Sequence, residues 1–308
     1  MNEGEWVLAQ RIRGMGSAAV ASGLQIALDE LRRAGVRVSP SSRQERALRA
    51  LMRYNRREAP VPANDERAMA LLREQHRTAW ETFLIGYGTY LCRRRRYSPF
   101  TREKLQELIG GSELPDPRKT ISRDTQFELY VATMLALGGL EVRPGEPDLV
   151  FGYGVENVGI AVKRIVGASA RTIAGRVESA VTQIRGSGRR GFVAVQLDRP
   201  LAPLRARGPR SRLLQEYARA FDDVTDALRP FAGDNEVLGA MVYGYAAEWQ
   251  MPGRSKRLPQ LRSAMPFRWM GLADDGAQKM FFDDFTRRWQ GGAHAHLDFL
   301  LKWGRSPA

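Results

Sequence analysis

Cysteine is almost absent from this sequence of 308 residues, in which Cys92 is the only one. A single thiol excludes a disulfide within the chain and a zinc site built from several cysteines. No apolar run reaches the roughly 18 residues that a membrane-spanning helix requires. The first residues, MNEGEWVLAQRIRG, also lack the apolar centre of a secretory signal peptide. We therefore expect a cytoplasmic protein that has no contact with membranes.

Negative charge is scarce relative to positive charge. The chain has 34 acidic residues against 48 basic ones, which gives a formal net charge of +14 and a pI near 10.4. Contacts between basic side chains and phosphates release condensed counterions, so such an excess favours a polyanionic partner. We expect this partner to be nucleic acid, with double-stranded DNA as the first choice. An acidic protein partner and simple solubility are the alternatives.

Several familiar catalytic motifs are missing. The sequence has no GxSxG and no HExxH, which gives no support to the hydrolases that use these motifs. The segment Gly152-Tyr153-Gly154 is not followed by GK[ST] and opens no predicted helix, so it is not a phosphate-binding loop. His76 has no other histidine near it in the sequence, and we interpret it as a structural residue.

Two domains are expected from the change of pattern along the chain. Residues 1–117 show apolar spacings of three and four, as in AAVASGLQIALDELRRA, which are typical of amphipathic helices. The segment GGSELPDP then interrupts this pattern. We therefore predict an all-helical N-terminal domain over residues 1–117 and a second domain, with a C-terminal extension, over residues 118–308.

The second domain combines helices with short apolar runs. A predicted helix, FELYVATMLALGG, is followed by the runs LEVRP, PDLVFGY, VGIAVKRIV and GFVAVQLD. Such runs are typical of strands in an α/β protein. Aromatic residues near the C-terminus are expected to lie in its core rather than to stack on bases: Trp269, Phe281, Phe282, Phe285 and Trp289.

Two of these apolar runs carry side chains that can take part in catalysis. Asp148 follows Pro147 at the start of one run, and Lys163 lies in the next, after the turn-rich segment GYGVEN. Glu128 lies in the preceding helix, and the helix that follows carries Gln183. Phosphodiester cleavage needs a divalent metal held by carboxylates, a positioned water and a cation near the developing charge. These residues supply the acids and the cation, and carboxylates of this kind hold Mg²⁺.

In this order of parts the chain resembles the PD-(D/E)XK, or restriction-endonuclease-like, superfamily over about residues 123–198. The resemblance implies a mixed central sheet flanked by helices and a Mg²⁺- or Mn²⁺-dependent endodeoxyribonuclease. It also implies that Asp148 ligates the metal with Glu128, that Lys163 orients water or stabilises charge, and that Gln183 supports the site. Because members of this superfamily commonly act in restriction or antiviral defence, the resemblance also implies such a role. This role is compatible with a homodimer or with a partner subunit.

One position departs from the superfamily pattern. The second acid is expected two residues before the lysine, and Ala161, which cannot ligate a metal, stands there. In some members of the superfamily the next helix supplies this acid instead, and Glu178 is the residue at that place here. Five residues of helix turn Glu178 about 140° away from Gln183. Glu156, in the turn, is a weaker substitute. The alternatives are an exposed Glu178, a chance pairing of two short motifs, and an inactive module of this fold that binds nucleic acid or a partner protein.

Basic residues in and around the second domain are predicted to contact phosphates. Such contacts position a duplex without reading its sequence. A solvated surface is the alternative for any one of these residues. The predicted set is Arg164, Arg185, Arg189, Arg190, Arg205 and Arg207.

Overall fold

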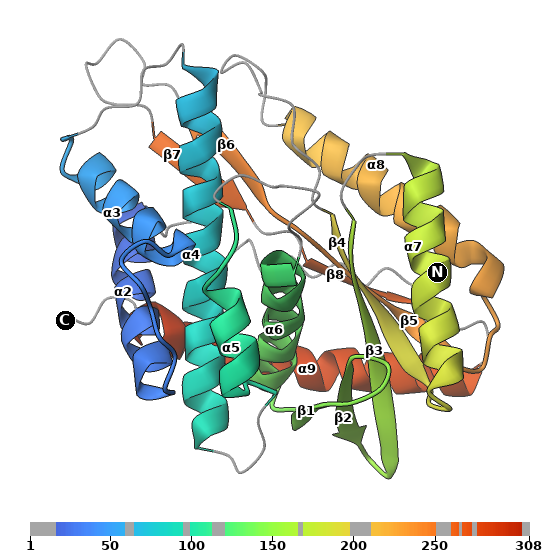
Figure 1. The fold of residues 1–308 in the computed structure, drawn as a ribbon. Coiled ribbons are helices and arrows are strands. Elements are labelled where there is room, and N and C mark those ends of the chain that lie inside the picture. Colours follow the sequence, from blue (N-terminus) through green and yellow to red (C-terminus); the bar gives the residue numbers. More distant parts are fainter. Residues whose placement is uncertain are drawn as a thin grey trace.

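The structure, a computed structural model, describes residues 17–58, 65–94, 99–112, 121–165, 169–197, 211–250, 260–264, 267–272 and 276–303. The helices are α2 (Ser17–Arg33), α3 (Arg43–Asn55), α4 (Glu66–Arg93), α5 (Arg102–Leu108), α6 (Ile121–Leu137), α7 (Ala170–Gly186), α8 (Ser211–Leu228), the short 3-10 helix η1 (Arg229–Phe231) and α9 (Gly276–Trp303) (Figure 1). None of these helices combines the length and the apolar character that crossing a bilayer needs.

The strands form a mixed sheet, as the sequence predicts. Its order is β1 (Val142–Pro144), β2 (Leu149–Tyr153), β3 (Glu156–Ile165), β4 (Gly191–Leu197), β5 (Val237–Gly244) and β8 (Phe267–Gly271). The three central strands β3, β4 and β5 are parallel, whereas β1, β2 and β8 pair antiparallel with their neighbours. A separate antiparallel pair consists of β6 (Ala246–Gln250) and β7 (Gln260–Ala264).

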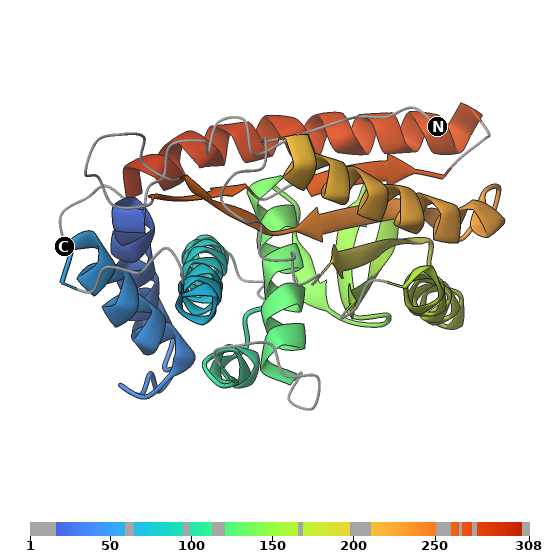
Figure 2. The ribbon, with the colours of Figure 1, turned by 90° about the horizontal axis from the view of Figure 1, so that it is seen from above.

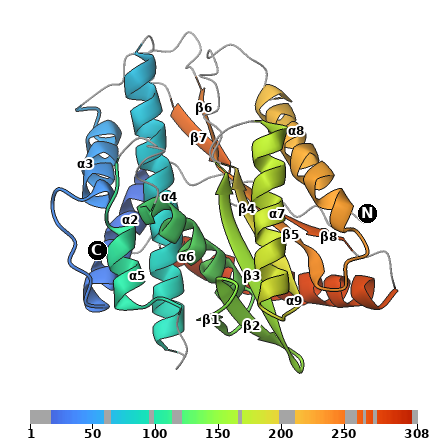
Figure 3. The ribbon, with the colours of Figure 1, turned by 45° about the vertical axis from the view of Figure 1, so that its right-hand side comes forward.

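Helices cover both faces of this sheet. Alternate residues of β4 enter two different apolar clusters: Phe192 packs with residues of α6 and α9, whereas Val193 packs with residues of α7 and α8. Figure 3 shows α7 lying across β3 and β4. Because both faces are covered, every residue of β4 is buried. The predicted core positions of Trp269, Phe282, Phe285 and Trp289 are confirmed, and Phe281 packs against the same core while partly buried.

The N-terminal helices share a core with the sheet. One apolar cluster contains Leu24 of α2, Leu48 of α3 and Phe83 of α4 together with Leu135 of α6 and Phe192 of β4. In Figure 2, α4 lies between α2 and α6, so it joins the two parts. The predicted boundary at residues 117 and 118 lies outside the described residues, and the helices on either side of it are packed as one body.

Local sequence signals position the elements that carry the candidate site. The β2–β3 hairpin turns at Gly154, whose φ of 62° is readily adopted by glycine and disfavoured for other residues. Thr101 caps α5 by accepting a hydrogen bond from the backbone of Lys104, and Ser169 caps α7 in the same way from Thr172. At Gly159 a side chain would come within 2.6 Å of the ring of Pro147, so glycine lets the segment before β2 lie against β3.

Candidate active site

Asp148 and Lys163 lie side by side at the open end of the β2–β3 hairpin. Leu149 pairs with Ile160 in the antiparallel register, which brings the residue before β2 next to the middle of β3. The Asp148 carboxylate accepts a hydrogen bond of 2.7 Å from the backbone N–H of Val162, and its Oδ2 is 3.9 Å from Nζ of Lys163. The two side chains are 28% and 17% exposed, so both can be reached from solvent.

Gln183 connects the acid and the lysine. Its Oε1 accepts a hydrogen bond from Nζ of Lys163, and its Nε2 donates to Oδ1 of Asp148 at 3.2 Å and to the backbone carbonyl of Pro147 at 2.8 Å. One amide therefore fixes both functional groups relative to the hairpin. The predicted association of Asp148, Lys163 and Gln183 is present in the structure.

Glu128 lies beside this group on α6. Burial raises the pKa of its carboxyl group; the contact with Lys104 opposes that shift, and the negative charge of Asp148 adds to it. The ammonium group of Lys104 donates a hydrogen bond to the Glu128 carboxylate. Sequence reasoning missed Lys104, which the short helix α5 presents to α6.

The sequence predicts a magnesium ion held by carboxylates at this site. Mg²⁺ is commonly bound by one or two carboxylates, with water and phosphate oxygens as the remaining ligands. Asp148 and Glu128 are the two acids available for this role. Ala161 is fully buried against residues of α7 and contributes no oxygen. In the part of the chain that the structure describes, no group of three or more His, Cys, Asp or Glu side chains is placed to hold a metal.

The acids considered as replacements for Ala161 lie elsewhere. Glu178 is exposed on α7, whereas Gln183 on the same helix faces β3, in agreement with the rotation of about 140° between them. Glu156, at the start of β3, accepts hydrogen bonds of 3.3 Å from Arg190. The structure therefore does not bring Glu178 to Asp148, because the rotation of α7 turns it to the surface.

The predicted phosphate-contacting arginines fall into different environments. Arg164 is buried and its Nε is 2.9 Å from Oδ1 of Asp124, which counts against a phosphate contact at this position. Arg185 is held by Asp234 at 2.5 Å, and Arg189 donates to the carbonyl of Glu146 at 3.0 Å. Arg190 is paired with Glu156, as above. Arg205 and Arg207 lie outside the described residues.

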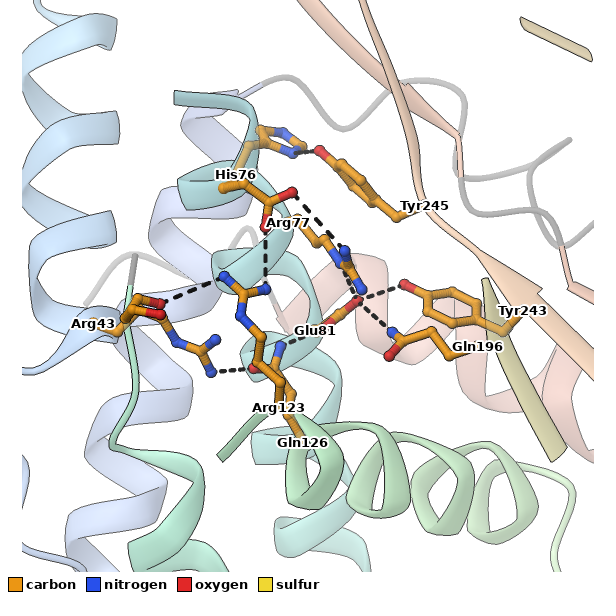
Figure 4. Close-up of polar contacts among 11 residues, drawn as sticks. Arg43, His76, Arg77, Glu81, Arg123, Gln126, Gln196, Tyr243 and Tyr245 are labelled. Atoms are coloured by element: carbon orange, nitrogen blue, oxygen red, sulfur yellow. Dashed lines mark hydrogen bonds and ion pairs between the residues drawn. The ribbon is translucent and has the colours of Figure 1, made fainter. Parts of the chain in front are cut away.

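A second polar cluster lies between the helices and the sheet, centred on Glu81 of α4 (Figure 4). Glu81 accepts hydrogen bonds from Arg77 at 2.9 Å, from Tyr243 at 2.9 Å and from Gln196 at 3.4 Å. Gln126 of α6 also donates to it. All five side chains are buried, which indicates a structural network rather than a site for substrate.

The same cluster includes an unusual arginine. Arg43 of α3 donates to Gln126 from a position where it is 2% exposed. Burial, followed by the nearby positive charge of Arg123, lowers the pKa of Arg43 to about 9. The cluster thus connects α3, α4 and α6 to strands β4 and β5 at an electrostatic cost.

His76 is buried at the edge of this cluster. Its Nδ1 is 2.9 Å from the hydroxyl group of Tyr245, and burial lowers its pKa from 6.5 to about 4. A neutral, buried imidazole agrees with the interpretation of His76 as a structural residue.

Comparison with models of known families, with curated proteins and with solved structures found no match to this chain. The contacts among Asp148, Lys163 and Gln183, with Glu128 on α6, are therefore the basis for proposing a function. The fold is that of an α/β protein with a mixed six-stranded sheet flanked by helices.

Proposed function

We propose that this protein is a metal-dependent nuclease that hydrolyses phosphodiester bonds in DNA, built on a restriction-endonuclease-like core. The observation that carries the proposal is the contact of Asp148 and Lys163 at the hairpin, with the Gln183 amide bonded to both. Two β-runs that resemble the PD-(D/E)XK pattern are adjacent in space, and their acid and lysine are partly open to solvent.

Each residue has a role that follows from its position. Asp148 and Glu128 would hold Mg²⁺ or Mn²⁺, and the bound ion would polarise a phosphate oxygen and lower the pKa of a bound water. The ammonium group of Lys163 would position the attacking water and stabilise the charge that develops on the phosphate. Gln183 would keep Lys163 and Asp148 at a fixed separation through its hydrogen bonds.

A second candidate function is an inactive module of the same fold that binds nucleic acid or a partner protein. Two observations favour it: Ala161 is buried where the superfamily has an acid, and Lys104 already neutralises Glu128. Either candidate is compatible with a cytoplasmic role in restriction or antiviral defence. This role, and the homodimer or partner subunit that it would involve, follow from the resemblance alone.

Plasmid cleavage separates the two candidates. We expect the purified protein to cut supercoiled or linear DNA with Mg²⁺ or Mn²⁺ and not with EDTA. Asp148→Asn and Lys163→Met should each lower the rate by about 10²- to 10³-fold, the usual effect of losing one group that stabilises the transition state. Glu178→Gln, on the exposed side of α7, is the matched control and should cut normally.

Two results would decide against the nuclease. DNA binding without cutting under every metal condition supports the inactive module. Cutting that persists unchanged in Asp148→Asn would place the chemistry elsewhere and overturn the proposal.

A further inference from the structure

The outward surface of α3 carries a row of arginines. Arg49, Arg53 and Arg56 are spaced by four and three residues, which places them on one face. All three are exposed, whereas Gln44, Leu48 and Leu51 on the opposite face are buried. We call Arg49, Arg53 and Arg56 the α3 arginine face, and we propose that it binds the phosphate backbone of duplex DNA.

Little in the described structure neutralises these arginines. Arg49 donates to the backbone carbonyl of Pro40 at 2.7 Å, which leaves its charge unpaired. Arg56 is 3.8 Å from Glu58, but the side chains are 63% and 52% exposed, and an ion pair of this kind contributes little. Arg53 makes no hydrogen bond or ion pair within the described ranges.

The arginines predicted from the sequence differ in this respect. Arg164, Arg185 and Arg190 have carboxylate partners at 2.9, 2.5 and 3.3 Å. A phosphate would have to compete with these carboxylates for the same N–H donors. On the α3 arginine face it would compete mainly with water, so the gain from binding is greater there.

The α3 arginine face and the candidate active site belong to parts of the structure that share one apolar core. Gln44 of α3 donates to the carbonyl of Leu108 at the end of α5, the helix that carries Lys104. Figure 2 shows α3 at one end of the molecule and α7 at the other, with α5 between them. A duplex bound by the α3 arginine face would therefore be contacted at a distance from the candidate site.

The chemistry of the α3 arginine face suits a phosphate backbone. Guanidinium groups bind phosphate oxygens in a bidentate manner, and duplex DNA offers about one charge per 1.7 Å of its axis. At about 1.5 Å per residue, the three arginines span roughly 10 Å of helix. Contacts of this type position a duplex without reading its sequence. The choice of DNA as the polyanion rests on the proposed function, but the surface itself does not depend on cleavage.

The test compares two variants that each lose three positive charges. One replaces Arg49, Arg53 and Arg56 with Gln. The charge-matched control replaces three other exposed arginines with Gln: Arg219 of α8, Arg229 of η1 and Arg287 of α9. Both are made in the Asp148→Asn background and assayed in EDTA, so that cleavage plays no part. Fluorescence anisotropy with a 25-bp duplex between about 50 and 200 mM salt gives the affinity and its salt dependence.

We expect the α3 variant to bind about tenfold more weakly than its parent near 100 mM salt. The slope of log affinity against log salt should become shallower by about 2 to 3, close to one for each lost contact. The control should keep the slope of the parent. Equal losses in both variants would mean that only net charge matters, and an unchanged slope in the α3 variant would also overturn the proposal.

Failure of binding and failure of cleavage remain distinguishable in this design. A protein that cuts DNA but binds it equally well without the α3 arginines would keep the proposed function and lose the α3 inference. A protein that never cuts DNA, yet binds it through α3, would keep the α3 inference and lose the proposed function. A parent that does not bind the duplex even at low salt overturns the inference, and an acidic protein would then be the remaining partner class.

Discussion

Among single residues, Gln183 has the most specific role, because one amide contacts both proposed catalytic groups. Gln183→Leu should lower the rate of DNA cleavage about 10- to 100-fold, the range found when residues that orient metal ligands are replaced. The expected cause is lost positioning of Lys163 and Asp148. Thr182→Ala, at the exposed neighbouring position of α7, should leave the rate unchanged. Equal rates in the two variants would contradict the role.

Lys104 is the second residue with a testable role, since its ammonium group already balances the charge of Glu128. A divalent cation must compete with it for the same carboxylate. Lys104→Met should therefore bind Mn²⁺ about two- to fivefold more tightly at pH 8, in line with the energy of a partly exposed ion pair. Isothermal titration calorimetry measures this, with Lys104→Arg as the control that keeps the charge. Weaker binding by Lys104→Met would show that the lysine helps to hold the site open.

His76 predicts how stability responds to acid. Its pKa is lowered in the folded state to about 4, against 6.5 in the unfolded chain. Between these values the unfolded state binds the extra proton, so the free energy of unfolding falls as pH drops from about 6.5 to 4. The full effect is roughly 3 kcal/mol. Urea unfolding at several pH values should show this slope in the parent and a smaller one in His76→Gln; identical slopes would refute it.

At the scale of elements, the Glu81 cluster holds α4 against α6 and the sheet. Glu81→Leu would leave the buried donors of Arg77, Gln126 and Tyr243 without their acceptor. We expect a loss of about 3–5 kcal/mol in the free energy of unfolding, because the buried guanidinium group of Arg77 loses the nearer of its two carboxylates and two neutral donors lose their acceptor. Urea unfolding measures the loss. Glu58→Gln, an exposed acid, is the control and should stay within about 0.5 kcal/mol of the parent.

The hairpin shows why part of the site was predictable. Asp148 and Lys163 are 15 residues apart on two adjoining strands, so a local turn is enough to bring them together. The apolar runs and the glycine of the turn specify that hairpin. Gln183 was predictable because the helix after β3 returns across the sheet. For these residues the sequence order and the strand and helix periods determine the contact.

Packing between elements decided what the sequence left open. Arg164 next to Lys163 has the charge of a phosphate-binding residue, but β3 is a central strand covered on both faces, and Arg164 is buried. Lys104 reaches Glu128 only because α5 docks on α6. In the Glu81 cluster, Glu81 and Tyr243 are hydrogen-bonded although they are 162 positions apart, and no local pattern signals such a group.

At the scale of the whole molecule, the helical N-terminal part and the α/β part are one structure. A single apolar cluster extends from Val20 of α2 to Trp289 of α9. The +14 net charge indicated a polyanionic partner, but only the structure shows which arginines are already paired and which face outward.

The most direct test of the proposed metal-dependent site is the position of a metal ion in crystals soaked with Mn²⁺, located by anomalous diffraction. We predict one ion bonded to carboxylate oxygens of Asp148 and Glu128, with Lys163 beside it, and no ion in Asp148→Asn crystals. An ion bound elsewhere, or the same two carboxylates empty at millimolar Mn²⁺ with DNA present, would contradict the account.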